Sequence, residues 1–342
     1  MTTKKLKLAD IARLAGVSKS TVSFVLNGHA KKHRINEETV KKVEAIAAAN
    51  NYSPSIYARA LKSKQTYTAG LVIPDLANMG FASIAKRLEV LCRNHGYQLL
   101  IASSDDNPEM EKQVIQSLVD RQVDVLFVAT SFTSEQYLQQ VKQTTPIILF
   151  DRVFEDSAFT TIKTDAASAT QEVVSKLVEG VDECWYIGGQ MDLSPSRDRF
   201  IGYQAALLQA GIDFRQEHVL NKDYQPSSGY DLMANVVSSR GCAPKAVFTA
   251  SYSLLEGVLR YLTEHNMLSD DIQIATFDNY DILDCLPLKI DSVEQDCESI
   301  AQALFNAGQS VLEHPSKAPE QLSIPAKIHY RRQVSANKRM LT

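Results

Sequence analysis

The sequence predicts two parts of different fold class, an all-α head of three short helices and an α/β body built on doubly wound parallel sheets. Three observations predict them. Apolar residues recur at helical spacing through the first fifty residues, and from Tyr67 onward short β-rich runs alternate with amphipathic stretches. The charge also changes sign: residues 1–65 hold thirteen Lys and Arg against four Asp and Glu, a net +9, and the remaining 277 residues hold 23 against 36, a net −13. A basic head on an acidic body indicates a nucleic-acid-binding module joined to a second function.

Length and composition exclude several classes of protein. The 342 residues suffice for two or three domains at roughly 100 to 200 residues each. Apolar runs such as 146–150 are far shorter than the roughly 20 residues of a membrane span, and no apolar segment follows the N-terminal basic residues as in a signal peptide. The five cysteines are scattered and form no C-x-x-C pair. We therefore expect a cytoplasmic protein without membrane contact, disulfide framework, metal or cofactor.

The first fifty residues predict three helices with recognisable ends. An apolar stripe begins at Leu8 and ends before Gly16, whose conformational freedom suits a tight turn. Ser18 can cap a second helix that residues 27–28 end, and Asn36 can cap a third. A helix, a glycine-containing turn and a second short helix form the helix-turn-helix arrangement, whose second helix enters the major groove of DNA.

The second predicted helix would then be the recognition helix. Its outward face can read base edges, and the short hydroxyl and amide donors near its ends suit phosphate and sugar contacts. The residues expected to contact DNA here are Lys19, Ser20, Ser23 and Phe24 on the outward face, Ser18, Thr21 and Asn27 toward the backbone of the duplex, and Leu8 at the start of the first helix. The alternative is a small helical domain with a solvated basic face, and His29 and His33 in the following loop either touch phosphate or are solvated.

Two strings at the N-terminus resemble the head of the lactose-repressor (galactose-repressor) family of transcriptional regulators. LADIARLAGVSKSTVSFVLNG, followed by RINEETVKKVEAIAAANNYSPS, contains the pattern D-I-A-x-x-A-G-V-S-x-x-T-V-S-x-V-L-N, and the rest of the chain also follows the family. The resemblance implies a homodimer on pseudo-palindromic double-stranded operator DNA. It also implies a two-lobed body, like that of periplasmic sugar-binding proteins, with a sugar effector between the lobes. Phe24 departs from the arginine common at its position, so its base contact stays open; a thymine methyl group is possible.

The expected domains are residues 1–52 (head), 53–65 (hinge helix and linker), 66–330 (effector-binding and dimerisation body) and 331–342 (tail). Residues 55–62, SIYARALK, are fewer than the roughly 12–15 at which an isolated helix becomes marginally stable in water. The resemblance implies that this hinge helix pairs with its dimer mate in the minor groove. Leu61 would be a wedge between base steps, Ala58 would permit close approach, and Ser55 and Lys62 would join the contact. A plain charged linker is the alternative.

Polar residues follow most predicted strands of the body. Ligands in parallel sheets sit beyond the carboxyl ends of strands, and carboxylates with arginine forks suit sugar hydroxyls and phosphates. The first strand is followed by Asp75 and Asn78, and the fourth by Asp151 and Arg152. The expected strands are 69–73, 98–102, 125–129, 147–150, 183–187, 246–249, 272–277 and 289–293, with helical stretches such as 81–95, 108–121 and 168–177 between them.

The resemblance assigns roles in the effector cleft. Arg199 in R-D-R-F-x-G-Y falls on the family's sugar-clamping arginine, and Asp278 in T-F-D-N on its sugar-binding aspartate. Tyr224 lies where some members stack an aromatic ring on the sugar, and Ser251 lies where many relatives carry asparagine.

The D-R pair at Asp151 and Arg152 matches relatives that recognise fructose and its phosphates. GGQMDLSPSRDRFIGY, YQPSSGY, VFTASYSLLEGVLRY and TFDNYD resemble the sucrose-operon repressors, a branch near the fructose-responsive catabolite repressor/activator. Arg152, Arg197 and Arg199 together would suit an anion. Alternatively, Arg197 could pair with Asp198 on the surface and Asp151 could cap a helix.

We therefore predict a repressor of a sugar-utilisation operon, namely the operon for sucrose. Fructose or a fructose phosphate would release this repressor from its operator. Alternatives are a fructose-phosphate-responsive global catabolite repressor/activator and a repressor of another sugar. An enzyme or a transport protein is disfavoured, because no histidine pair has metal-ligand spacing and no G-x-S-x-G or phosphate-cradling glycine loop occurs. Trp185 is expected in a strand core. Residues 330–342 lack leucine heptads, which favours a dimer over a tetramer.

Overall fold

The computed structural model describes residues 6–52, 65–269 and 271–332, and the chain divides into two compact units, residues 1–67 and 68–342. Four of the expected DNA-contacting residues, Ser55, Ala58, Leu61 and Lys62, lie outside the described residues, as does the tail from residue 333.

The first unit contains the three predicted helices, which are α1 (Leu8–Ala15), α2 (Lys19–Leu26) and α3 (Glu37–Ala49). Gly16 has a φ of +69° and ends α1 in the left-handed conformation that glycine adopts without steric cost. The Ser18 hydroxyl accepts a hydrogen bond of 3.1 Å from the Thr21 amide, and the Asn36 side chain accepts one of 2.7 Å from Thr39, so both predicted caps are confirmed. The apolar stripes of the helices meet in one core of Ile11, Ala12, Ala15, Val22, Val25 and Val43.

The second unit holds two six-stranded sheets. The first sheet has the order β11-β5-β4-β3-β1-β2, and its neighbouring strands are all parallel. Its strands are β1 (Thr68–Ile73), β2 (Gln98–Ser103), β3 (Val125–Val128), β4 (Ile147–Phe150), β5 (Thr160–Thr164) and β11 (Gln321–Ile324). Its helices are α5 (Met79–Asn94), α6 (Pro108–Asp120), α7 (Gln136–Lys142) and α13 (Cys297–Glu313).

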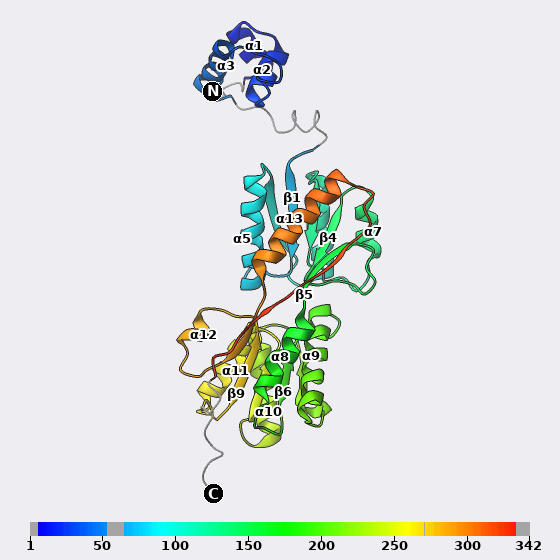
Figure 1. Cartoon of the computed structure of the whole chain (residues 1–342), viewed down its shortest axis with the longest axis vertical. Helices are drawn as coiled ribbons and strands as arrows, with labels where there is room; N and C mark the ends of the chain where they lie inside the picture. The colour runs from blue at the N-terminus through cyan, green and yellow to red at the C-terminus, as the bar shows by residue number, and fades with distance from the viewer. Residues whose placement is uncertain (1–5, 53–64, 270, 333–342) are drawn as a thin grey trace. The chain divides into compact units, whose positions relative to one another are not determined.

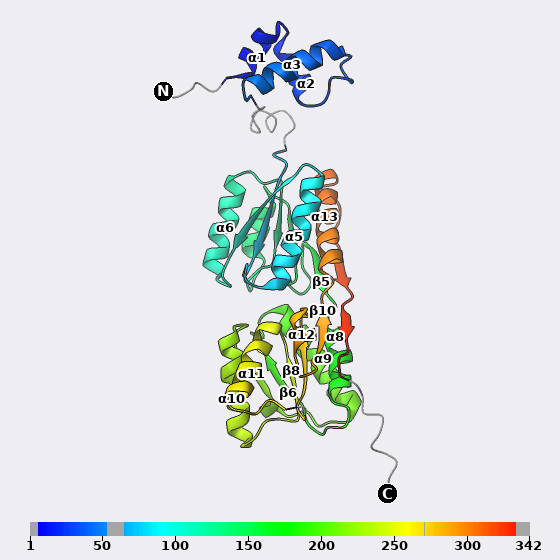
Figure 2. The same ribbon diagram turned by 90° about the vertical axis from the view of Figure 1, so that its left-hand side faces the viewer.

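Successive apolar side chains of β1 point to opposite faces of the sheet, and both faces are covered by helices. Leu71 and Ile73 pack into the core under α5 and α13, whereas Val72 packs into the core under α6 and α7. Figures 1 and 2 show α5 and α13 side by side on one face. We call this sheet with its helices the first lobe.

The second sheet repeats the same winding, with the order β12-β10-β9-β8-β6-β7, and only its β12 pairs antiparallel. Its strands are β6 (Trp185–Gly188), β7 (Val219–Asn221), β8 (Ala246–Thr249), β9 (Gln273–Phe277), β10 (Asp291–Glu294) and β12 (Lys327–His329). Helices α8 (Ala166–Leu177) and α9 (Ser194–Ala210) pack together on one face, and α10 (Pro226–Arg240) and α11 (Tyr252–Glu264) on the other (Figure 2). The short α12 (Ile282–Cys285) and the 3-10 turn η1 (Gln216–His218) complete this second lobe.

The chain passes between the lobes three times, from β5 to α8, from β10 to α13 and from β11 to β12. Strand order reverses beside β1 in the first lobe and beside β6 in the second, and such switch points are where ligands bind in doubly wound sheets. The predicted fold class, a helix-turn-helix head with a two-lobed α/β body, is therefore confirmed.

All eight predicted strands occur, but four further strands, β5, β7, β11 and β12, were not predicted. β7 and β12 have only three residues each, and β11 is mostly exposed, so none shows a clear apolar period. Two helices begin two residues earlier than expected, α5 because Asn78 caps it and α8 because Asp165 caps it.

Within the described ranges, no helix has the length and apolar character required to cross a membrane, and no group of three or more His, Cys, Asp or Glu is arranged to hold a metal ion.

Candidate functional site

A cavity of about 330 Å³ lies between the two lobes at the carboxyl ends of their strands. Of the nine effector-binding residues expected from sequence, eight line it: Asp75, Asn78, Asp151, Arg152, Arg199, Tyr224, Ser251 and Asp278. The first four come from the first lobe and the others from the second. The parallel strands thus bring together side chains that lie far apart in the chain.

Arg199, on the first half of α9, is the central cation of this cavity. Its side chain is almost completely buried, and its Nη1 donates a hydrogen bond of 2.5 Å to the carbonyl oxygen of Ala250. The guanidinium lies over the Phe277 ring, 3.8 Å from its centroid. Its buried Nε has no hydrogen-bond partner among the described residues. A buried donor without a partner is costly, so this Nε is a donor that a ligand acceptor could satisfy.

Two aspartates from opposite lobes lie near Arg199. Asp151 follows β4 with a φ of +56°, and Asp278 follows β9 with a φ of +74°. Burial raises the pKa of Asp151, and Arg199 and Arg152 oppose this rise. Burial lowers the pKa of Arg199, but Tyr224 and the same two aspartates outweigh this effect and raise it. Both carboxylates occupy left-handed backbone that is uncommon for residues other than glycine, a form of strain that clusters at binding sites.

The helix-cap alternative for Asp151 is wrong. No helix occurs between β4 and β5, so Asp151 has no helix to cap. In contrast, Asp278 is held on both oxygens: one accepts a hydrogen bond of 2.9 Å from Gln295 Nε2, and the other accepts one of 3.4 Å from the Tyr252 amide.

Arg152 forms an ion pair with Asp106, a residue that sequence reasoning missed. The arginine is 6% exposed, and Asp106 has a φ of +55°. Asp106 comes just after β2, so the strand-end criterion that selected Asp75 and Asp151 would have found it had it been applied to that strand as well. The pairing means that a ligand anion would have to compete with an internal carboxylate for Arg152.

The remaining predicted residues of the cavity also have structural contacts. Ser251 caps α11, Asn78 caps α5, and Asp75 accepts a hydrogen bond of 2.7 Å from the Ala77 amide. Their other polar atoms can still face a ligand, since all three line the cavity. Further lining residues that were not predicted include Gln225, Ser253, Glu256 and Gln295.

Tyr224 is fixed by a hydrogen bond of 2.7 Å between its hydroxyl and that of Ser196, and its ring lies 5.9 Å from the Arg199 guanidinium. A Cβ atom at Gly189 would lie 2.2 Å from this ring, so only glycine permits its position.

Arg197 does not line the cavity, contrary to expectation. It donates a hydrogen bond of 2.7 Å to the Asp192 carbonyl, and its Nε lies 3.8 Å from Glu155. The alternative pairing with Asp198 is also wrong, because Asp198 pairs with Lys163 at 2.7 Å. Residues two positions apart on a helix point roughly 200° apart, so Arg197 and Arg199 cannot both face one side.

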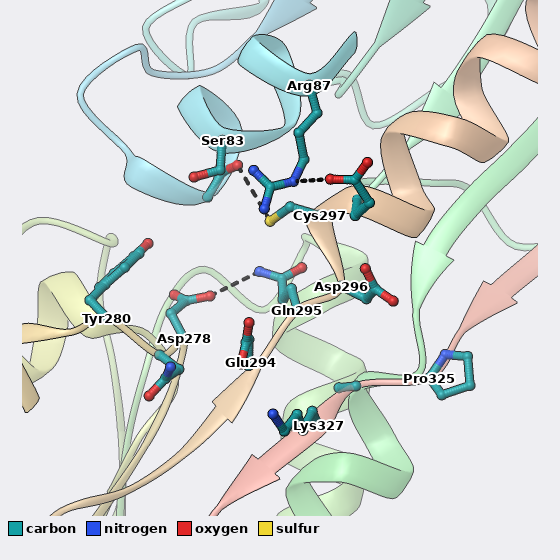
Figure 3. A pocket seen from close by; sticks show the side chains of 14 residues that line it. Ser83, Arg87, Asp278, Tyr280, Glu294, Gln295, Asp296, Cys297, Pro325 and Lys327 are labelled. Atoms are coloured by element: carbon teal, nitrogen blue, oxygen red, sulfur yellow. Dashed lines mark hydrogen bonds and ion pairs between the residues drawn. The ribbon is translucent and has the colours of Figure 1, made fainter. Parts of the chain in front are cut away.

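A second cavity, of about 460 Å³, adjoins the first beside the crossover from β10 to α13 (Figure 3). Gln295 lies in this crossover, and its Oε1 accepts a hydrogen bond of 2.9 Å from Thr164 while its Nε2 holds Asp278. Arg87 of α5 pairs with Glu298 of α13 at 2.9 Å. Figure 3 shows that Gln295 links Asp278 to the chain segment between the lobes. Asp278 is therefore coupled to two of the three crossovers.

In the head, Ser18, Lys19 and Ser20 are exposed at the start of α2. Thr21, Ser23, Phe24 and Asn27 are half-buried. The Asn27 side chain donates a hydrogen bond of 2.7 Å to the Ser23 carbonyl, and the Phe24 ring stacks on His33 with centroids 3.5 Å apart. Leu8 packs against the head core, so the contact that the structure gives it stabilises the head.

Trp185 is buried in β6 and stacks on His218, which confirms the expectation of a strand-core residue.

Comparisons with known families cover both units. Residues 7–55 match the bacterial regulatory proteins of the lacI family, and residues 66–325 match the periplasmic binding proteins and sugar binding domain of the LacI family. The chain is 43% identical over 332 residues to the sucrose operon repressor of Klebsiella pneumoniae, covering 97% of this chain and 99% of that protein.

Two solved structures are also similar. The Cra transcriptional dual regulator from Pseudomonas putida, in complex with fructose 1-phosphate, is 30% identical with a TM-score of 0.73, covering 78% of this chain and 99% of that one. The lac repressor dimer bound to operator and an anti-inducer has a TM-score of 0.83 over 96% of this chain and 98% of that one. Its sequence identity is 22%, so this likeness supports the fold alone.

Proposed function

The chain belongs to the lacI family of bacterial regulatory proteins, and on that premise we propose that it represses a sucrose-utilisation operon and leaves its operator when fructose or a fructose phosphate binds. A DNA-binding, sugar-responsive regulator, and not an enzyme, is what the family match over both units describes. The sucrose operon is supported by the Klebsiella pneumoniae relative, and the effector class by the Pseudomonas putida regulator that holds fructose 1-phosphate.

One observation carries the effector assignment: Arg199 is almost completely buried, its Nε has no hydrogen-bond partner within the described part of the chain, and it lies near Asp151 and Asp278 from opposite lobes. A sugar hydroxyl can accept a hydrogen bond from the guanidinium through its oxygen and donate one to a carboxylate through its hydrogen. Tyr224 adds a ring face for the apolar side of a sugar. This set of donors and acceptors matches a small polyol better than an apolar ligand.

The charges on the lining favour free fructose over its phosphate. Only two cations, Arg152 and Arg199, stand among the described lining residues, and Arg152 is already paired with Asp106. A phosphate group would also meet like charge in this space. The carboxylates of the lining are Asp75, Asp106, Asp151, Glu256 and Asp278.

We place the switch at the crossovers between the lobes. A sugar bound to Asp278 engages a carboxylate that Gln295 ties to the crossover segments, so closure on the sugar would reorient the lobes. A cytoplasmic homodimer whose two heads occupy the halves of a pseudo-palindromic operator completes the proposal. Reorientation would separate the two hinge segments, where Leu61→Ala is expected to weaken operator binding and leave sugar binding intact.

The test uses the purified full-length chain and a symmetric duplex selected by this protein from a random pool. Fructose, fructose 1-phosphate, fructose 6-phosphate, glucose and sucrose are titrated into the complex, and release is followed by fluorescence anisotropy. Release by fructose at the lowest concentration supports the proposal. If neither fructose nor its phosphates release the duplex, the effector class is wrong.

A global fructose-phosphate-responsive regulator is the second candidate, and the dual-regulator relative that holds fructose 1-phosphate favours it. Mapping of the chain's binding sites across its genome separates the two. A few sites beside sucrose genes support the first candidate, and many sites beside central carbon genes support the second.

A further inference from the structure

The first turns of α9 present two neighbouring faces to different surroundings. Pro195 and Arg199, four positions apart, line the cavity. Ser194 and Asp198, also four positions apart, contact residues of the first lobe. Residues four positions apart lie on the same side of a helix. One helix of the second lobe therefore meets the ligand space with one side and the first lobe with the next.

The contact of Asp198 is an ion pair between the lobes. Its Oδ2 lies 2.7 Å from the Nζ of Lys163. Lys163 belongs to β5, which reaches the junction with the second lobe (Figure 1). The side chains of Asp198 and Lys163 are 22% and 36% exposed, so solvent screens this pair less than a fully exposed one.

A hydrogen bond adds a second contact between the lobes. The Ser194 hydroxyl accepts a hydrogen bond of 2.9 Å from the backbone amide of Val153, which lies between β4 and β5. Ser194 is buried, so its hydroxyl is held in place. Arg197 also reaches the first lobe, but its Nε is 3.8 Å from Glu155 and that carboxylate is 87% exposed, so this pair contributes little. We call the Lys163–Asp198 pair and the Ser194–Val153 hydrogen bond the interlobe latch.

The lobe arrangement that closes the interlobe latch also brings the cleft residues together. Asp151 of the first lobe lines one cavity with Arg199 and Asp278 of the second. A sugar that contacts both lobes requires them at this separation. If the lobes moved apart, the interlobe latch would open, because hydrogen-bond distances span only about 2.7 to 3.2 Å.

We infer that Lys163, Asp198 and Ser194 are positioning residues, which stabilise the lobe arrangement that binds the sugar and thereby strengthen release from the operator. None of the three lines the cavity, so they act through the placement of Arg199 and not on the ligand. A contact that favours the binding-competent arrangement raises the apparent affinity for the ligand. The inference rests on the proposed release by a sugar and adds to it the residues that set how much sugar is needed.

Exchange of the two charges tests the ion pair in the full-length chain. Lys163→Glu and Asp198→Lys each place like charges opposite one another, so fructose affinity should fall about fivefold. The double variant restores an attractive pair and should bind fructose within about twofold of the unaltered chain. Fructose is uncharged, so the exchanged charges act on it only through the lobes. Calorimetry measures the affinity, and anisotropy with the selected symmetric duplex measures the fructose concentration for half release, which should rise by the same factor.

Operator affinity without sugar separates positioning from a loss of structure. It should stay equal or rise in the single variants, because the arrangement that fructose stabilises is the one that releases DNA. A damaged body would bind the operator more weakly. Lys176→Glu is the control, because its partner Glu179, at 2.8 Å, lies in the same lobe. This variant should keep the fructose affinity of the unaltered chain.

Ser194→Ala tests the hydrogen bond. It removes the acceptor of the Val153 amide and should weaken fructose binding about fivefold, again without weakening operator binding. Ser134→Ala is the matched control, because the Ser134 hydroxyl accepts a hydrogen bond of 3.3 Å from the Gln136 amide within the first lobe. The control should bind fructose normally.

The outcomes distinguish this inference from the proposed function. If fructose releases the unaltered chain and the single charge variants at the same concentration, the pair does not position the lobes and the inference is wrong. It is also wrong if the double variant is as weak as the single ones, or if operator binding without sugar weakens as well. If another titrated sugar releases the unaltered chain, the variants are compared with that sugar. If none does, the proposed function fails, and the inference fails with it.

Discussion

Lys19 at the start of the recognition helix is exposed to solvent, whereas Arg199 in the cleft of the body is 6% exposed and lies against the Phe277 ring. Both are cations assigned to a ligand, but their surroundings differ. The charge of the head acts in water, where dissolved ions screen it. The charges of the cleft act where water is largely excluded, so each must find a partner and burial shifts their pKa values.

The two regions should therefore respond to different variables. Salt competes directly with the head for DNA phosphates. In the cleft, hydrogen-bond geometry and protonation decide the affinity, and salt matters little. DNA binding and sugar binding can therefore be measured separately in the full-length chain.

The largest expected effect is that of salt. Raising the concentration from about 50 to 200 mM should weaken operator binding roughly 10³-fold or more if six or more phosphates are contacted. Fructose affinity should change less than about twofold, since Arg152, Arg199 and Asp278 are buried. Fluorescence anisotropy and calorimetry measure the two. Equal salt sensitivity would mean that the cleft charges are solvated.

Arg199→Lys should come next. Lysine cannot reproduce the planar fork that bonds Ala250 and leaves donors for the sugar, so fructose affinity should fall about 100-fold. DNA binding without sugar should remain, giving a repressor that sugar does not release. Arg197→Lys, on the same helix but outside the cavity, is the matched control and should bind fructose normally. Loss of DNA binding in Arg199→Lys would show that the two regions are not separable.

Asp151→Asn should weaken fructose binding by about tenfold, because a charged acceptor for sugar hydroxyls is lost. The same variant should raise the melting temperature of the body in neutral buffer. Burial raises the pKa of Asp151 in the folded protein, so the ionised carboxylate opposes folding above that pKa. Asparagine keeps the left-handed backbone without the charge. The melting-temperature difference should shrink as the pH falls toward the ordinary aspartate value. A less stable variant at neutral pH would contradict the burial argument.

The smallest expected effect is the pH dependence of sugar binding. If fructose requires ionised Asp151, its affinity should fall as the pH drops through the raised pKa, by at most about tenfold per unit. Arg199 and Arg152 oppose the rise in the pKa of Asp151, while Asp278 and Asp106 add to it, and the affinity is expected to fall toward acidic pH. DNA binding should not weaken over this range, because lysine and arginine stay charged. If the fructose affinity of the unaltered chain is as independent of pH as that of Asp151→Asn, then Asp151 does not bind the sugar.

Particular residues show where sequence reasoning succeeded. Gly16, Ser18 and Asn36 were recognised as helix ends because caps and turns depend on neighbours within four positions. Four cleft residues, Asp75, Asn78, Asp151 and Arg152, were found because a polar residue after a buried strand has a predictable place in a parallel sheet, and the other four were found through the resemblance to the family. Arg197 was misplaced because the motif containing it was taken whole, although helical geometry turns alternate residues apart.

Local chemistry accounts for the three-helix head, the alternating strands and helices of the body and most of the polar residues at the strand ends. Which of those charges lie buried, and which meet, was decided only when the sheets packed. Arg152 pairs with Asp106 across 46 positions, and Gln295 accepts from Thr164 across 131. Such contacts depend on how whole strands and crossovers are placed relative to one another. The residues of a short segment do not determine that placement.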